Sequence, residues 1–156
     1  MGLGATIRRL GALAVIAIIA GCAPFSDDEL RGLVEDVLPG DSSLVECEWG
    51  SQAGFGAEVP DAYYECSYIT EGGVDGVTRA IVTRLVAEGF LLSCARGASR
   101  VELVAARGQI AVFAEIDAPG VGPASEYDIP PGQVFLAVAA ARFPQAPAVV
   151  ADTGGC

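Results

Sequence analysis

The feature that most limits what this chain can fold into is an uninterrupted apolar run over residues 10–20, close to its N-terminus. Arg8 and Arg9 precede the run, and the first acidic residue is Asp27. Positive charge followed by an apolar stretch of this length is typical of a secretory signal peptide. A permanent membrane-spanning helix needs about twenty apolar residues, and this run is shorter. We therefore predict that residues 1–21 are a leader that is removed on export.

The apolar run ends in Ile19-Ala20-Gly21-Cys22. This tetrapeptide resembles the lipobox of bacterial lipoproteins, in which an aliphatic residue and two small residues precede the lipid-modified cysteine. The resemblance covers the leader alone. It implies that the Cys22 Sγ atom receives a diacylglycerol and that a signal peptidase cuts the chain just before Cys22.

A lipid on Cys22 would anchor the protein stably. Lipoproteins carry two or three acyl chains, and each buried methylene contributes about 0.8 kcal/mol to membrane binding. The expected location is the extracytoplasmic face of the cell membrane, with residues 22–26 as lipidated N-terminus and short linker. The alternatives are an ordinary signal peptide with a chance cysteine and an uncleaved anchor helix.

The chain is strongly acidic. It has 20 acidic residues and 9 basic ones, with no Lys and no His. The arginines beyond the leader are scattered rather than clustered: Arg31, Arg79, Arg84, Arg96, Arg100, Arg107 and Arg142. Nucleic acid is therefore not an expected partner, because its binding needs a basic stripe that neutralises phosphates. Without His or Lys, a His-based triad, a His metal site and a lysine Schiff base are excluded. We expect no catalytic residue, cofactor or metal.

Four cysteines follow the lipidated one: Cys47, Cys66, Cys94 and Cys156. An even number of cysteines in an exported domain predicts two disulfides. Among the three possible connectivities we favour Cys47–Cys66, because these residues lie in neighbouring strand-like segments. Cys94–Cys156 then follows by elimination and would pin an irregular tail, residues 144–156, to the body. Each bridge would contribute about 2–4 kcal/mol.

Residues 27–143 are expected to form a single domain with two helices. The sequence from Ser26 to Glu29 fits a capping box, and the apolar residues after it recur at helical spacing until Pro39. A second apolar stripe at helical spacing, from Val77 to Val86, predicts a helix that is capped near Asp75 and followed by Gly89.

The remaining periodic segments predict strands, at residues 44–49, 62–69, 90–94, 100–106 and 109–116. Residues 133–142 are ambiguous, because their alanines suit a helix while the alternation of Val134, Leu136 and Val138 suits a strand, which we favour. Residues 118–132 contain four prolines and predict a loop or strap. The order helix–strand–strand occurs twice, which is a weak internal repeat. The expected fold class is α+β, an antiparallel sheet with two helices on one face.

The predicted first hairpin gathers acidic residues. If Cys47 faces Cys66 across an antiparallel pair, other residues align two by two: Trp49 with Tyr64, Val45 with Tyr68, and Glu48 with Glu65. The aromatic and sulfur-rich side then faces the core, and the opposite side presents Glu46, Glu48 and Glu65. Like charges directly opposite each other destabilise a strand pair. Solvent and a nearby arginine would offset them, or else this side binds a basic partner or a divalent cation.

Two functions are compatible with these features. The first is a non-catalytic accessory or assembly subunit that binds another envelope protein. The alternative is a binding module for a small apolar ligand or lipid, held between the sheet and the helices. A closed, filled core favours the first function, whereas an apolar cavity of roughly 300 Å³ or more under the proline-rich strap favours the second.

Overall fold

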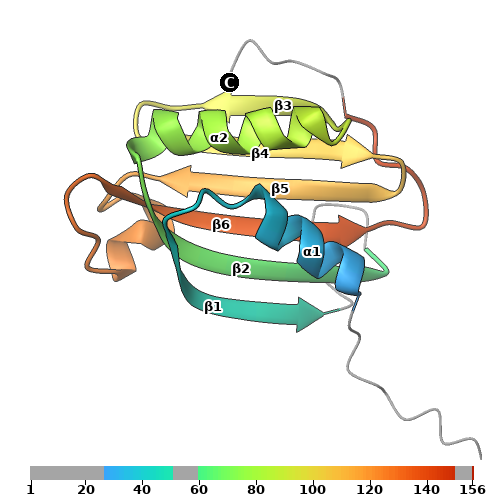
Figure 1. The fold of residues 1–156 in the computed structure, drawn as a ribbon, viewed down its shortest axis with the longest axis horizontal. Coiled ribbons are helices and arrows are strands. Elements are labelled where there is room, and N and C mark those ends of the chain that lie inside the picture. Colours follow the sequence, from blue (N-terminus) through green and yellow to red (C-terminus); the bar gives the residue numbers. More distant parts are fainter. Residues whose placement is uncertain (1–26, 51–59, 150–155) are drawn as a thin grey trace, which may run out of the picture.

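The fold is built around a six-stranded sheet in which all neighbouring strands are antiparallel (Figure 1). The computed structural model describes residues 27–50, 60–149 and 156. Its elements, in chain order, are α1 (Asp28–Val37), β1 (Ser42–Gly50), β2 (Ala62–Glu71), α2 (Gly73–Ala87), β3 (Leu91–Arg96), β4 (Arg100–Arg107), β5 (Ile110–Asp117), the 3₁₀ helix η1 (Gly122–Glu126) and β6 (Gln133–Arg142). The strand order is β1-β2-β6-β5-β4-β3. The predicted α+β class is confirmed.

Both helices lie on the same face of the sheet (Figure 1). Their apolar sides are buried against the inward residues of the strands: Leu30, Leu33, Val34 and Val37 from α1, and Val77, Ile81 and Leu85 from α2. Burial of each such side chain contributes about 1.5–3 kcal/mol. Among the described residues, no helix has the length and apolar character needed to cross a membrane.

A side-chain cap begins α1. The Asp27 carboxylate accepts hydrogen bonds from the backbone N–H groups of Glu29 and Leu30, at 3.2 and 3.3 Å. The same carboxylate forms an ion pair of 3.0 Å with Arg142 of β6, which also pairs with Glu29 at 2.7 Å. Arg142 therefore ties the start of α1 to the end of β6. Ser26, the predicted cap, lies outside the described residues.

The predicted cap of the second helix near Asp75 is wrong. Helix α2 starts at Gly73, directly after Gly72, whose φ of 112° lies in the left-handed region. Glycine adopts this conformation without steric cost, so the chain turns from β2 into α2 with no side-chain cap. Asp75 lies in the first helical turn, where a negative charge is favourable, and it forms an ion pair with Arg96 of β3. Gly89 follows the helix as predicted, with a φ of 80°.

The β1–β2 hairpin keeps most of the predicted register: Cys47 faces Cys66, Glu48 faces Glu65, and Trp49 faces Tyr64. The predicted pairing of Val45 with Tyr68 is wrong, because Leu44 takes that place. A β-bulge between Leu44 and Glu46 is the cause. A bulge adds one residue to one strand only, so the pairing shifts by one position beyond it.

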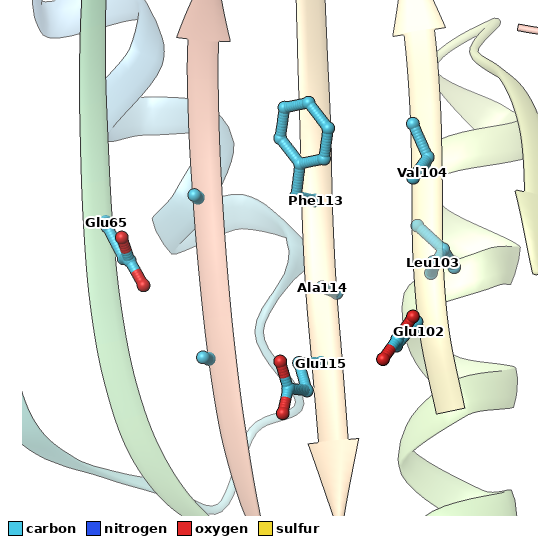
Figure 2. A pocket seen from close by; sticks show the side chains of 9 residues that line it. Glu65, Glu102, Leu103, Val104, Phe113, Ala114 and Glu115 are labelled. Carbon is cyan, nitrogen blue, oxygen red and sulfur yellow. The ribbon is translucent and has the colours of Figure 1, made fainter. Parts of the chain in front are cut away.

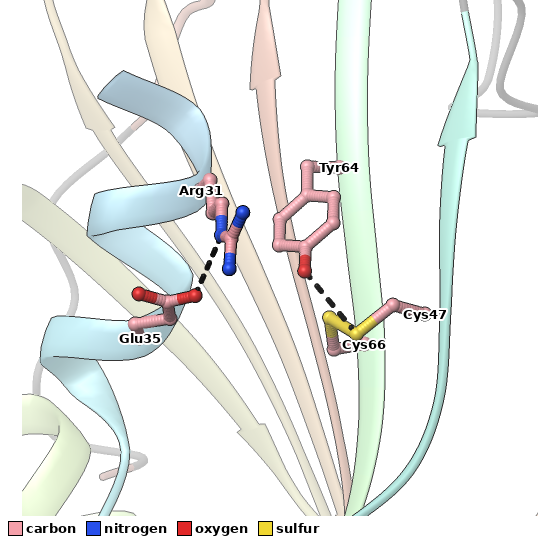
Figure 3. The surroundings of a disulfide bond; sticks show 5 residues. All are labelled: Arg31, Glu35, Cys47, Tyr64 and Cys66. Carbon is pink, nitrogen blue, oxygen red and sulfur yellow. Dashed lines mark hydrogen bonds and ion pairs between the residues drawn. A yellow bond between two sulfur atoms is a disulfide. The ribbon is translucent and has the colours of Figure 1, made fainter. Parts of the chain in front are cut away.

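Both predicted disulfides are present. The first joins Cys47 of β1 to Cys66 of β2, and the hydroxyl of Tyr64 donates a hydrogen bond of 3.3 Å to Cys47 Sγ on the side facing α1 (Figure 3). The second joins Cys94 of β3 to Cys156. Because β1 and β3 are the outermost strands, each edge of the sheet is held by one disulfide.

The ambiguous segment, residues 133–142, is a strand over its whole length. Strand β6 lies between β2 and β5, so side chains on both of its faces are largely buried. Val134, Leu136 and Val138 belong to the core under the helices. The alternating residues between them face the other side of the sheet. A central strand buried on both faces is apolar throughout, which explains why its sequence also resembles a buried helix.

Candidate interaction surface

The face of the sheet opposite the helices, here called the open face, carries neither α1 nor α2 (Figure 1). Two adjacent rows of paired residues cross its middle. One row consists of Glu48, Glu65, Ala139, Phe113 and Val104, and the next of Glu46, Ser67, Ala137, Glu115 and Glu102. These two rows bring together glutamates from two strand pairs, β1–β2 and β4–β5, that are far apart in the sequence.

A groove of about 250 Å³ lies in the middle of the open face (Figure 2). The short side chains of Ala137 and Ala139 on β6 leave room between the longer side chains of the flanking strands. Glu65 of β2 lies on one side of the groove, and Phe113 and Glu115 of β5 lie on the other. The groove therefore has an apolar floor, and its walls carry both acidic and apolar side chains.

The predicted acidic residues Glu46, Glu48 and Glu65 do lie together. They line a smaller hollow of about 150 Å³ beside the β1 edge. Among the described residues, no arginine forms an ion pair with any of the three. The hydroxyl of Tyr127 donates a hydrogen bond of 3.3 Å to Glu46. The sequence allowed for a nearby arginine that would offset these like charges. The described residues place no arginine in an ion pair with them.

The surroundings of Glu65 in the β1–β2 hairpin raise the pKa of its carboxyl. Burial raises the pKa of the Glu65 carboxyl, and the charges of Glu48 and Glu46 raise that pKa further. A carboxyl whose pKa is higher in the folded chain holds its proton more tightly there than in the unfolded chain. The free energy of unfolding therefore falls as the pH rises from the ordinary pKa of glutamate through the raised pKa of Glu65.

We predict that Glu65→Gln makes the folded protein more stable at pH 7, because it removes a half-buried charge that faces Glu48. The gain should shrink as the pH falls below about 4, where the wild-type carboxyl is protonated in both states. Thermal unfolding at several pH values measures this. Glu71→Gln, at an exposed position of the same strand, is the control and should change little. An equal gain at every pH would contradict the assignment.

A second acidic group, Glu102 and Glu115, has its own cation. Arg100 pairs with Glu115 at 2.9 Å and with the fully buried Asp117 at 2.6 Å, and it approaches Glu102 to 3.8 Å. Burial raises the pKa of Glu115, as does the neighbouring Asp117, whereas Arg100 lowers it. Neither glutamate was predicted as part of a site. The turn at residues 108–109 sets the register of β4 and β5 and places Glu102 directly opposite Glu115.

The geometry gives the cation interpretation no support. Within residues 27–50, 60–149 and 156, no three Cys, Asp or Glu side chains are arranged to hold a metal ion. Glu46, Glu48 and Glu65 line one hollow, but their carboxylates do not form such a group.

The proline-rich segment packs against the sheet. Its residues Ala124 and Ile129 are buried against Phe135 of β6, and Tyr127 stacks on Phe135 with ring centroids 5.1 Å apart. Between the sheet and the helices, large side chains such as Leu136 are fully buried. Another hollow, of about 380 Å³, has a largely charged lining that includes Asp75, Arg79 and Arg96. These contacts favour a filled core over a pocket for an apolar ligand.

The chain matches no protein-family model, and no curated protein or solved structure is significantly similar to it. Cys22, the predicted site of lipid attachment, lies outside the described residues. The function is therefore inferred from the sequence of the leader and from the geometry of the open face.

Proposed function

We propose that this protein is a membrane-anchored extracytoplasmic lipoprotein that serves as a non-catalytic accessory or assembly subunit and binds another envelope protein. The observation that carries the proposal is the open face, which neither α1 nor α2 covers and which holds Glu46, Glu48 and Glu65. Among the described residues, no arginine pairs with these three glutamates. Such a surface is shaped for contact with a basic protein rather than for enclosing a small molecule. The absence of His and Lys supports a role without catalysis.

The anchor would hold the open face close to the membrane. Fully extended at about 3.6 Å per residue, the chain from Cys22 to Asp27 reaches at most about 18 Å. Asp27 is bound to Arg142 at the end of β6, and the arrowhead of β1 lies at this same end of the sheet (Figure 1). With this end toward the membrane, the open face points sideways. It is then accessible to a protein embedded in, or anchored to, the same membrane.

Charge favours a protein partner over the lipid surface itself. The sequence carries a net charge of −11, so anionic headgroups repel it. A basic segment of a neighbouring protein is attracted instead, and attraction of this kind raises the rate of association. The lipid supplies location, and the acidic open face supplies recognition.

The test is in-cell crosslinking of the anchored protein, followed by affinity capture and mass spectrometry. We expect a stoichiometric envelope protein that disappears with Cys22→Ala. It should also disappear when Glu46, Glu48 and Glu65 are all changed to glutamine. The matched control is the triple variant Asp36→Asn, Glu71→Gln and Glu126→Gln, which changes the same charge at exposed positions outside the two rows of paired residues.

The outcomes separate the parts of the proposal. A partner that is retained by the control and lost from the open-face variant supports it. A partner retained by both variants contradicts recognition by the acidic residues. An empty capture from cells in which the Cys22 peptide is lipidated contradicts the accessory role.

A further inference from the structure

The two edges of the sheet are not equivalent. At β3, Cys94 is bonded to Cys156, and Arg96 donates a hydrogen bond of 3.0 Å to the Cys156 carbonyl oxygen, so the far end of the chain is fastened to this edge. At β1, none of the described residues pairs with the outer side of the strand. Exposed edges attract further strands, and most proteins cover or disrupt them.

The register shows which backbone groups β1 offers. Cys47 and Cys66 are directly opposite, with Cα atoms 4.1 Å apart. This short separation identifies a non-hydrogen-bonded pair, in which the N–H and C=O groups of both residues point away from the partner strand. Two residues further along, Trp49 repeats the arrangement opposite Tyr64. Cys47 and Trp49 thus each present a hydrogen-bond donor and an acceptor at the free edge.

The side chains of β1 divide into two chemical classes. On the helix side, Leu44 is 61% exposed, and Trp49 is 38% exposed while its ring lies 4.1 Å from that of Tyr64. On the open face, Glu46 and Glu48 are exposed. An added strand would therefore meet apolar side chains on one face and carboxylates on the other.

These features argue against a second copy of the chain as occupant. Two β1 strands paired edge to edge would place glutamates next to glutamates, and like charges on neighbouring strands are destabilising. The bulge after Leu44 also limits the regular part of the edge to residues 46–50. A short extended segment with alternating basic and apolar residues fits the charge, the exposed apolar side chains and the backbone groups together.

We propose that the β1 edge binds such a segment of the partner protein as an added strand. The basic side chains face Glu46 and Glu48, the apolar ones contact Trp49, and the backbone pairs with Cys47 and Trp49. Main-chain hydrogen bonds supply affinity in this mode of recognition, and alternate side chains supply specificity. The inference rests on the proposed function only in taking the natural ligand to be a protein.

The test uses the mature, lipidated full chain in micelles of a neutral detergent, with a synthetic heptapeptide of alternating arginine and valine as probe. Trp49 is the single tryptophan of the chain, so its fluorescence reports binding at this edge. We expect saturable binding that weakens about tenfold or more when alternate backbone nitrogens of the peptide are methylated. Methylation keeps the charge and the side chains but removes the N–H donors.

The variants refine the same titration. Glu46→Gln with Glu48→Gln should weaken binding roughly fivefold, whereas Glu71→Gln with Glu126→Gln should not. Equal affinities for the methylated and unmethylated peptides would overturn the added strand and leave simple charge attraction. Normal peptide binding combined with an empty in-cell capture would overturn the proposed function while supporting the edge as a strand-binding site.

Discussion

Replacing Cys94 and Cys156 by serine is expected to lower the free energy of unfolding by about 4 kcal/mol, and replacing Cys47 and Cys66 by about 3 kcal/mol. The physical reason is the entropy of the unfolded chain. The Cys94–Cys156 bridge closes a loop between residues 62 positions apart, and the Cys47–Cys66 bridge a loop between residues 19 positions apart. A longer closed loop restricts the unfolded chain more, so its loss costs more.

Urea unfolding of the two double variants, followed by circular dichroism, measures the two costs and their order. Each variant keeps one intact disulfide and is therefore the control for the other. The order of the two losses distinguishes loop entropy from local contacts. Loop entropy predicts the larger loss for Cys94–Cys156, whereas local packing predicts it for Cys47–Cys66, because Cys66 is buried in the core and Cys156 is only partly buried. A larger loss for the Cys47–Cys66 variant would mean that packing around Tyr64 outweighs loop length.

The second large effect is expected for Leu136→Ala, which should lower the free energy of unfolding by about 2–5 kcal/mol. Leu136 is fully buried on the central strand β6, between Tyr68 of β2 and Ile116 of β5. Truncation removes apolar contacts and leaves a cavity that strands on both sides prevent from collapsing. Chemical denaturation at pH 7 measures the loss.

Leu91→Ala is the matched control for this core variant. Leu91 is 59% exposed on the edge strand β3, so the same truncation should change stability by no more than about 0.5 kcal/mol. Similar losses for Leu91→Ala and Leu136→Ala would show that β6 is not the centre of the core, contrary to the described strand order.

The parts of the fold that depend on local pattern were predictable from sequence. The helices follow from apolar residues at helical spacing, and the first hairpin and its disulfide follow from alternation around Cys47 and Cys66. The bulge after Leu44 could not be predicted, because the alternation of apolar and polar residues in β1 does not reveal it. The start of α2 was misplaced because Asp75 looks like a cap, whereas the left-handed conformation of Gly72 makes a cap unnecessary.

The candidate site was only half predictable, for a reason of topology. Glu46, Glu48 and Glu65 come from one hairpin, so local register places them together. The groove forms only if β6 lies between β2 and β5. The pairing of β2 with β6 joins segments that are separated in the sequence by α2 and three strands. Ala137 and Ala139 become a groove floor only in that position. Nothing local in the sequence of β6 specifies its neighbours.

The central claim is that this domain is held at the membrane by a lipid on Cys22, with its acidic open face turned toward a protein partner. The most direct test is mass spectrometry of the N-terminal peptide of the protein purified from the membrane fraction. The predicted result is a chain that begins at Cys22 and carries a diacylglycerol on Sγ. A mature chain that begins at another residue, or an unmodified Cys22, would contradict the claim.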